Sequence, residues 1–168
     1  MEDANKMNLQ IKTATEKDIP AIIALMREFA EYEDLLDRLE ITEERMNAAL
    51  FGGSAVAEAI VAFVDDEAVG YAVFYPNFST FRGQRGMFLE DIFIQPAHRR
   101  GGTGEKMLRH IARLARERGY ERIDFMVLDW NTTAIDFYKK HGAVMDESER
   151  HFKFTDAAFE NLANFMGN

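Results

Sequence analysis

A glycine-rich turn flanked by basic residues carries the densest set of potentially reactive or ligand-binding groups in the chain. It contains two arginines and three glycines, in the run Arg99, Arg100, Gly101, Gly102, Thr103 and Gly104. Glycine lets backbone N–H groups approach an anion closely, and a helix start adds unpaired N–H groups and a positive dipole end. Arginine adds bidentate donors. The turn therefore predicts a diphosphate site, with a plain chain reversal and solvated arginines as the alternative.

Two common phosphate motifs do not fit this turn. Lys106 lacks the spacing from the first glycine that a Walker loop requires, and no Ser or Thr follows it. A dinucleotide-binding fingerprint would need glycine at the position of Met107. The sequence therefore indicates a diphosphate that belongs to another kind of ligand.

A second motif helps to identify the ligand that carries the diphosphate. The segment "WNTTAIDFYKKHGA", from Trp130 to Ala143, places an asparagine and then a tyrosine before Gly-Ala. Together with the Arg-x-x-Gly-x-Gly pattern of the turn, it resembles the GNAT N-acetyltransferases, and the resemblance covers nearly the whole chain in element order. The segments "LEDIFI", "VLDWN" and "FYKKHGA" resemble the diamine acetyltransferase branch, which includes the spermidine/spermine and thialysine enzymes. The loop "FSTFRG" resembles the thialysine type.

Glu90 is the candidate base for this chemistry, because an amine is charged near neutral pH and must lose a proton before it attacks a thioester. It interrupts an apolar strand face, which we assign to Phe88, Ile92 and Ile94. Partial desolvation should therefore raise the pKa of Glu90. An edge carboxylate paired to an arginine is the alternative. Strand alternation predicts that Asp91 lies on the opposite face with a structural role.

Tyr138 is the candidate acid, since its ring can pack in the core while its hydroxyl reaches the sulfur. The resemblance implies that it donates a proton to the departing thiolate; the alternative is a core tyrosine on an amphipathic helix. Asn131 would bind the pantetheine arm of acetyl-CoA or the adjacent backbone. Lys140 would reach the phosphates or complement the helix dipole.

The remaining contacts to acetyl-CoA would come from backbone groups. Strand residues Ile92, Phe93 and Ile94 would pair with the pantetheine amides, like an extra strand added to a sheet. The resemblance places the diphosphate at the turn and at the first helical residues through Glu105.

The resemblance implies an acceptor side of six residues, namely Glu31, Tyr32, Glu33, Phe81, Glu90 and Arg150. A solvated acidic face around Glu31 and Glu33 is the alternative. Ser79 and Phe81 stand where the polyamine-type enzymes have an acidic residue and a tryptophan. Arg150 would repel a second ammonium and attract a carboxylate. These differences favour a lysine-like diamino acid over a long polyamine.

Hydrophobic periodicity and turn residues predict the elements that position these groups. Strands are expected at 9–14, on both sides of an acidic turn at 65–66, and at 87–94, 122–128 and 150–154. Helices are expected after Thr15, after Thr42, over 102–118, over 132–141 and near the C-terminus. The fold class is therefore α/β, and the resemblance implies a GNAT-type mixed, mostly antiparallel β-sheet flanked by helices on both faces. We expect one N-acetyltransferase domain over residues 1–168.

Composition and charge exclude several classes of protein. The chain has 168 residues, no cysteine, and four histidines without metal-ligand spacing, so we expect neither disulfides nor a metal. It has 20 basic and 29 acidic residues, a net charge of −9. This balance disfavours nucleic acid and anionic membranes and favours a small cationic amine. No apolar run approaches the length of a membrane span. We expect a cytoplasmic homodimer.

The sequence thus predicts an acetyl-CoA-dependent N-acetyltransferase that acts by direct transfer in a ternary complex. The acceptor would be the primary amine of thialysine, a lysine-like diamino acid or a diamine. One alternative is a non-catalytic acyl-CoA-binding or interaction domain, and the other is acetylation of a polyamine or peptide amine. The presence of both Glu90 and Tyr138 favours the enzyme.

Overall fold

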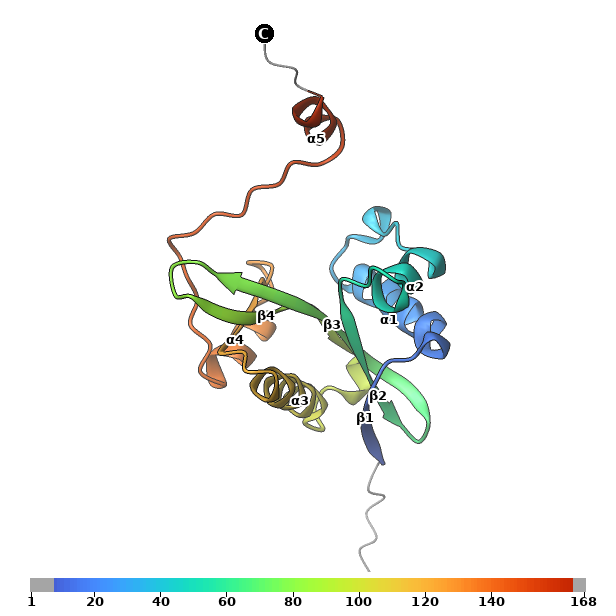
Figure 1. The fold of residues 1–168 in the computed structure, drawn as a ribbon. Helices are drawn as coiled ribbons and strands as arrows, with labels where there is room; N and C mark the ends of the chain where they lie inside the picture. The colour runs from blue at the N-terminus through green and yellow to red at the C-terminus, as the bar shows by residue number, and fades with distance from the viewer. Residues whose placement is uncertain (1–7, 165–168) are drawn as a thin grey trace, which may run out of the picture. The chain divides into compact units, whose positions relative to one another are not determined.

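The computed structural model describes residues 8–164 (Figure 1). The chain divides into two compact units between Met126 and Val127. The elements of the first unit are β1 (Leu9–Thr13), α1 (Ile19–Tyr32), α2 (Glu43–Phe51), β2 (Glu58–Val64), β3 (Glu67–Ser79), β4 (Gln84–Ile94), α3 (Thr103–Glu117) and β5 (Arg122–Phe125). Those of the second unit are α4 (Thr132–Lys140) and α5 (Asp156–Ala163). Short 3-10 helices lie at Glu16–Asp18, Leu36–Arg38 and Pro96–His98.

The sheet of the first unit has the strand order β1-β2-β3-β4-β5. Neighbours are antiparallel except β4 and β5, which are parallel. Asp65 and Asp66, with φ of 49° and 67°, form the two-residue turn between β2 and β3. Positive φ at both central residues matches the right-handed twist of a hairpin. The expected mixed, mostly antiparallel sheet is confirmed.

Helices cover both faces of this sheet, as expected (Figure 1). One face packs against α1 and α2, in a core that includes Ile22, Leu25, Tyr71, Val73 and Phe93. The other face packs against α3, in a core that includes Ala72, Phe74, Leu89, Met107 and Ile111. The apolar positions of α3 recur every four residues, which places them along one stripe of the helix.

The strands β4 and β5 pair only over a short stretch, Gly86–Leu89 with Arg122–Phe125. Beyond Leu89, β4 continues to Ile94 and pairs with β3 alone. The last residues of β4 therefore have one side that the sheet of the described residues does not cover.

Two sequence-based expectations about strands are wrong. The strand expected over 122–128 ends at Phe125. The segment 150–154 is not a strand, and the side chains of Phe152 and Phe154 are 86% and 66% exposed. The period-two pattern of this segment suits a strand, but a strand forms only where a neighbouring strand completes its hydrogen bonds.

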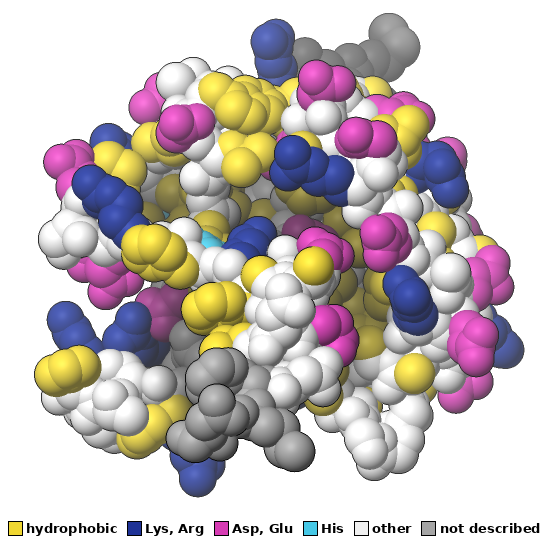
Figure 2. Space-filling model, turned by 90° about the horizontal axis from the view of Figure 1, so that it is seen from above, with side chains coloured by type: hydrophobic (Ala, Val, Ile, Leu, Met, Phe, Trp, Pro, Cys, Tyr) yellow, Lys and Arg dark blue, Asp and Glu magenta, His cyan; other side chains and the backbone are white. Residues whose placement is uncertain are grey.

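The surface carries charges of both signs. On the face drawn in Figure 2, acidic and basic side chains lie interspersed, with hydrophobic side chains between them. The excess of acidic residues is thus not gathered into one region of this face. Among the helices of residues 8–164, none combines the length and apolar character of a membrane span.

Candidate functional site

The glycine-rich turn has the backbone geometry of an anion site. Gly102 is the N-cap of α3 and adopts the left-handed conformation, with φ of 78°. The first backbone hydrogen bond of the helix runs from Lys106 N–H to the Gly102 carbonyl at 3.0 Å. Gly102 has no side chain to cap the preceding N–H groups, so the start of α3 can present them to an anion. Glu105, expected near the phosphates, has its carboxylate bound by Arg109 Nε at 2.8 Å.

The two arginines of the turn differ in their surroundings. Arg100 is exposed. Arg99 is half-buried, and its Nε donates a hydrogen bond to the Ile94 carbonyl at 2.8 Å. Its guanidinium carbon lies 4.6 Å from the ring centroid of Tyr32 and 5.5 Å from that of Phe93. Arg99 is therefore engaged by β4 and α1, whereas Arg100 is the solvent-facing cation.

The backbone at the end of β4 alternates between its two sides. Gln95 N–H donates to the Val69 carbonyl at 2.9 Å, so Gln95 faces β3. In an antiparallel ladder the next residues alternate, which directs the backbone groups of Ile94 and Ile92 away from β3 and those of Phe93 toward it. Three residues were expected to pair with pantetheine. The backbone groups of two of them, Ile92 and Ile94, thus point to the side of β4 that β5 does not cover beyond Leu89.

A β-bulge in β4 changes the orientation that strict alternation predicts. Val73 pairs with Asp91 and Phe74 with Leu89, so Glu90 is the extra residue of the bulge. Phe88 stacks on Tyr75 at a centroid distance of 5.2 Å. The expected shared face of Phe88, Ile92 and Ile94 is therefore wrong, because both isoleucines pack on the α3 side.

The bulge brings two consecutive carboxylates to the α1 side of the sheet. Tyr71 and Tyr75 lie on one face of β3, since they are four residues apart. The Tyr75 hydroxyl donates to Glu90 Oε2 at 3.0 Å, and the Tyr71 hydroxyl donates to Asp91 Oδ2 at 3.3 Å. The expectation that Asp91 lies on the opposite face from Glu90 is wrong.

Of the two carboxylates, Asp91 is largely buried and Glu90 is not. Glu90 is exposed, so its expected desolvation is wrong. Burial and, to a smaller extent, the charge of Glu90 raise the pKa of Asp91 to about 6, against the opposing hydrogen bond from Tyr71. Burial and the bond to Glu90 raise the pKa of Tyr75 to about 12.

The C-terminal end of α1 adds a third carboxylate to this group. Glu33 follows the helix and is half-buried; burial and then the charge of Asp91 raise its pKa. Tyr32, the last residue of α1, lies against Arg99 and keeps 40% of its surface exposed, and Glu31 is also exposed. The expected acceptor residues Tyr32 and Glu33 thus lie beside β4.

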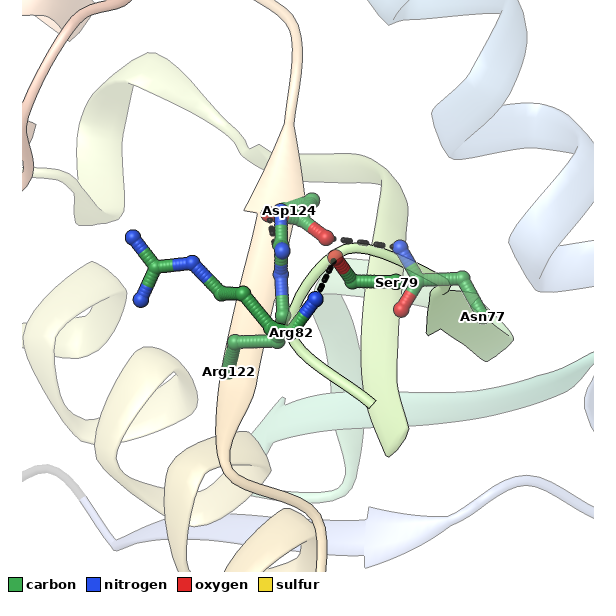
Figure 3. Close-up of polar contacts among 5 residues, drawn as sticks. All are labelled: Asn77, Ser79, Arg82, Arg122 and Asp124. Atoms are coloured by element: carbon green, nitrogen blue, oxygen red, sulfur yellow. Dashed lines mark hydrogen bonds and ion pairs between the residues drawn. The ribbon is translucent and has the colours of Figure 1, made fainter. Parts of the chain in front are cut away.

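The loop between β3 and β4 contains the residues expected to distinguish acceptors. Phe81 is fully exposed. Figure 3 shows that Ser79 Oγ accepts a hydrogen bond from Arg82 N–H, at 3.4 Å. At the base of the loop, Asn77 Nδ2 donates to Asp124 Oδ2 at 2.7 Å and Arg122 Nε donates to Asp124 Oδ1 at 3.0 Å (Figure 3). The bond from Asn77 joins β3 to β5 below the loop, and the bond from Arg122 lies within β5 and holds the Asp124 carboxylate.

The second unit contains the remaining expected residues. Asn131 is buried and caps α4, because its Oδ1 accepts from Ala134 N–H at 3.2 Å. The position expected to bind the pantetheine arm or the adjacent backbone is thus the N-cap of α4. Tyr138 is buried on α4, and burial raises its pKa to about 12. Lys140 ends α4 and is exposed.

Arg150, expected to attract a carboxylate, lies in the segment after α4. It is exposed, and its Nη1 donates to two backbone carbonyls of its own segment. These are Glu147 O at 2.8 Å and Glu149 O at 2.9 Å.

Sequence reasoning missed Tyr71 and Tyr75, and it missed that Asp91 lies on the same face of the sheet as Glu90. The available signal was an acidic pair within an apolar strand, opposite two tyrosines in the preceding strand. Pairing these residues correctly required knowledge of the bulge, which the sequence does not mark with glycine or proline.

The sequence and the fold of this chain are similar to those of known proteins. The sequence pattern described as the acetyltransferase (GNAT) family matches residues 20–143. A thialysine N-epsilon-acetyltransferase of Bos taurus is 36% identical over 166 residues, covering 92% of this chain and 97% of that protein. An L-ornithine N5-acetyltransferase of Arabidopsis thaliana is 25% identical, covering 94% and 89%. A solved integron cassette protein from the mobile metagenome of V. cholerae has a TM-score of 0.80 at 23% identity, covering 95% and 99%.

Proposed function

The chain belongs to the GNAT family of acetyltransferases, which use acetyl-CoA as cosubstrate, and from this premise we propose that it acetylates the side-chain amine of a lysine-like diamino acid. The observation that carries the choice of a cationic acceptor is the group formed by Glu33, Glu90 and Asp91 on the α1 side of the sheet. In the reaction the ammonium loses one proton, the amine nitrogen bonds to the thioester carbonyl carbon, and the C–S bond breaks. The nitrogen loses its second proton as the amide forms, and a proton from solvent converts the leaving thiolate to the free thiol.

The first unit supplies suitable groups for acetyl-CoA. The start of α3 offers backbone N–H groups to the diphosphate, and exposed Arg100 adds a positive charge. The backbone groups of Ile92 and Ile94 on the side away from β3 suit the pantetheine amides. Ile94 contributes its N–H for this purpose, because its carbonyl already accepts from Arg99.

Glu90 is proposed as the proton acceptor for the incoming ammonium, directly or through one water. It is exposed, so substrate can reach it, and Tyr75 orients one carboxylate oxygen. Asp91 beside it adds negative potential, which attracts the ammonium before deprotonation. Asp91 and Glu33 together would hold the cationic end of the acceptor.

Tyr138 is proposed as the hydrogen-bond donor to the leaving sulfur. With a pKa of about 12, its hydroxyl stays protonated throughout the neutral range. Complete proton transfer to a thiolate of ordinary pKa, about 8.5, would be uphill by roughly 5 kcal/mol. A hydrogen bond that strengthens as negative charge develops on sulfur avoids this cost and still lowers the barrier.

The acceptor class is proposed from charge and from the relatives. Two relatives are named for thialysine and L-ornithine, which are amino acids with an amine in the side chain. Such a substrate needs a negative site for its ammonium and a positive site for its carboxylate. Arg150 is proposed as the positive site; it would exchange a bond to Glu147 or Glu149 carbonyl for a bond to the substrate.

We also propose that residues 1–168 act as one cytoplasmic N-acetyltransferase domain in a homodimer. The family match crosses the boundary between the two units, which supports one domain. Exposed apolar side chains of the second unit support a second copy as partner, and they include Val144, Phe152, Phe154, Phe159 and Leu162. Light scattering on the parent and on a Phe152→Ser/Phe154→Ser variant tests this, and a monomeric parent would contradict it.

A panel of amines with acetyl-CoA tests the proposed activity by release of free thiol. The panel pairs each diamino acid with its decarboxylated diamine, so that the effect of the carboxylate is isolated. A chain that binds acetyl-CoA by calorimetry but releases no thiol above the hydrolysis background with any amine would instead be a non-catalytic acyl-CoA-binding domain.

A further inference from the structure

The side chain of Arg99 makes contacts within the protein that binding of a diphosphate does not require. Its Nε is committed to the Ile94 carbonyl, and its guanidinium lies over the rings of Tyr32 and Phe93. An arginine over an aromatic face combines cation–π attraction with stacking of two flat groups. The side chain thus connects the start of the glycine-rich turn to the end of α1.

The rings that Arg99 contacts belong to a longer packed series. Phe93 stacks on Phe29 of α1 at a centroid distance of 5.4 Å. Its ring is also tilted against that of Tyr71, with a centroid distance of 6.5 Å. Tyr71 in turn holds Asp91 through its hydroxyl. The aromatic residues therefore fix the position of the α1 end relative to the carboxylates of β4.

Tyr32 is the last residue of α1, and Glu33 follows it directly. A change in the position of the Tyr32 ring therefore moves the backbone that carries Glu33. Gln95 Nε2 makes a second connection from β4 to α1, at 2.9 Å from Glu28 Oε1, but this bond lies one helical turn earlier. Arg99 is thus the contact nearest to the acceptor carboxylate at the end of the helix.

We propose that Arg99 is a positioning residue for the acceptor amine, acting through Tyr32 and Glu33, and that it is not a ligand of the acetyl-CoA diphosphate. This inference rests on the proposed function for its account of Glu33. It assigns the two neighbouring arginines to different substrates: Arg100 to the cosubstrate and Arg99 to the acceptor.

The test compares three single variants, Arg99→Ala, Arg100→Ala and Arg116→Ala, with the parent. Arg116 is an exposed arginine of α3 and controls for the loss of one positive charge. We expect Arg99→Ala to raise the KM for the amine by roughly three- to thirtyfold, the range of a cation–π contact. Its dissociation constant for acetyl-CoA, measured by calorimetry, should stay within about twofold of the parent. Arg100→Ala should weaken acetyl-CoA binding and leave the amine KM unchanged.

Substitutions of Tyr32 separate positioning from a general structural effect. In a Tyr32→Leu background, Arg99→Ala should add little to the amine KM, because the ring through which it acts is gone. In a Tyr32→Phe background, which keeps the ring, the effect of Arg99→Ala should be retained. Arg99→Lys should recover only part of the parent KM, since lysine lacks the flat guanidinium.

Two results would overturn the inference. One is a loss of acetyl-CoA affinity in Arg99→Ala as large as in Arg100→Ala, with the amine KM unchanged. The other is an Arg99→Ala effect of equal size in the Tyr32→Leu and Tyr32→Phe backgrounds. If the parent acetylates no amine, the proposed function fails, while calorimetry with acetyl-CoA still decides whether Arg99 is a phosphate ligand. Melting temperatures of all variants identify any that do not fold, and Arg99→Lys then replaces Arg99→Ala in the calorimetry.

Discussion

Asp91→Asn should change how the stability of the protein depends on pH. In the folded chain the pKa of Asp91 is raised from 3.8 to about 6, chiefly by burial. The folded state therefore binds a proton more tightly than the unfolded state. The free energy of unfolding should fall as the pH rises from about 4 to about 6, by about 3 kcal/mol for a rise of this size.

Asparagine cannot ionise, so the variant should lack this part of the pH dependence. It should be less sensitive to pH than the parent between 4 and 6 and more stable than the parent at pH 7 to 8, by up to about 3 kcal/mol. The amide oxygen can still accept the hydrogen bond from Tyr71. The charge of Asp91 contributes to the raised pKa of Glu33, so Glu33 should ionise more easily once that charge is removed.

Urea denaturation of parent and variant, followed by circular dichroism at half-unit steps from pH 4 to 8, measures this difference. Glu90→Gln is the matched variant, because it removes the neighbouring exposed carboxylate and keeps Asp91; the pH dependence should be smaller than in the parent but retained, since the charge of Glu90 is the lesser cause of the raised pKa of Asp91. A difference in unfolding free energy between Asp91→Asn and parent that stays constant across this range would refute the account of Asp91 as a buried carboxylate.

Three further predictions concern the cosubstrate and the second unit. Gly102→Ala and Gly119→Ala both place a side chain at positive φ, at opposite ends of α3. Both should cost about 1 kcal/mol of stability, but only Gly102→Ala should weaken acetyl-CoA binding, by about tenfold or more in calorimetry; equal affinities would count against the anion site. Tyr138→Phe should lower kcat about a hundredfold with unchanged acetyl-CoA affinity, and a fully active variant would show that the hydroxyl is not used. Asn131→Ala should destabilise the chain by about 1 kcal/mol through loss of the α4 cap, with Asn131→Asp as the variant that keeps it; equal melting temperatures would contradict the capping role.

The fold could be predicted from the sequence where local pattern and packing agree. The apolar stripe over α3 indicates a helix. The two acidic residues Asp65 and Asp66 indicate a hairpin turn. The segment 150–154 shows the limit of such patterns. Alternation describes what a strand would bury, but it does not show whether a neighbouring strand exists to bury it against.

The candidate site was predictable in its residue types and less so in their orientation. Glu90 was identified from its position within an apolar strand, and Arg99 from its position in the glycine-rich turn. The direction of Glu90 depends on a bulge whose extra residue shifts the register by one, and this reverses the relation of Asp91 to its neighbours. The partner of Arg99, Tyr32, is distant in sequence, and only the packing of α1 on β4 brings the two together.

The proposed function is tested most directly by comparing acceptors. Initial rates of thiol release give kcat/KM for thialysine, for its decarboxylated diamine and for spermidine, at saturating acetyl-CoA. The account predicts a higher kcat/KM for thialysine than for either other amine, and a smaller difference in Arg150→Ala. Arg150 is exposed in the free protein, and if the bound substrate desolvates its pair with Arg150, loss of this partner corresponds to roughly 1–3 kcal/mol in the ratio of the kcat/KM values. A parent enzyme that acetylates spermidine with the higher kcat/KM would contradict the account.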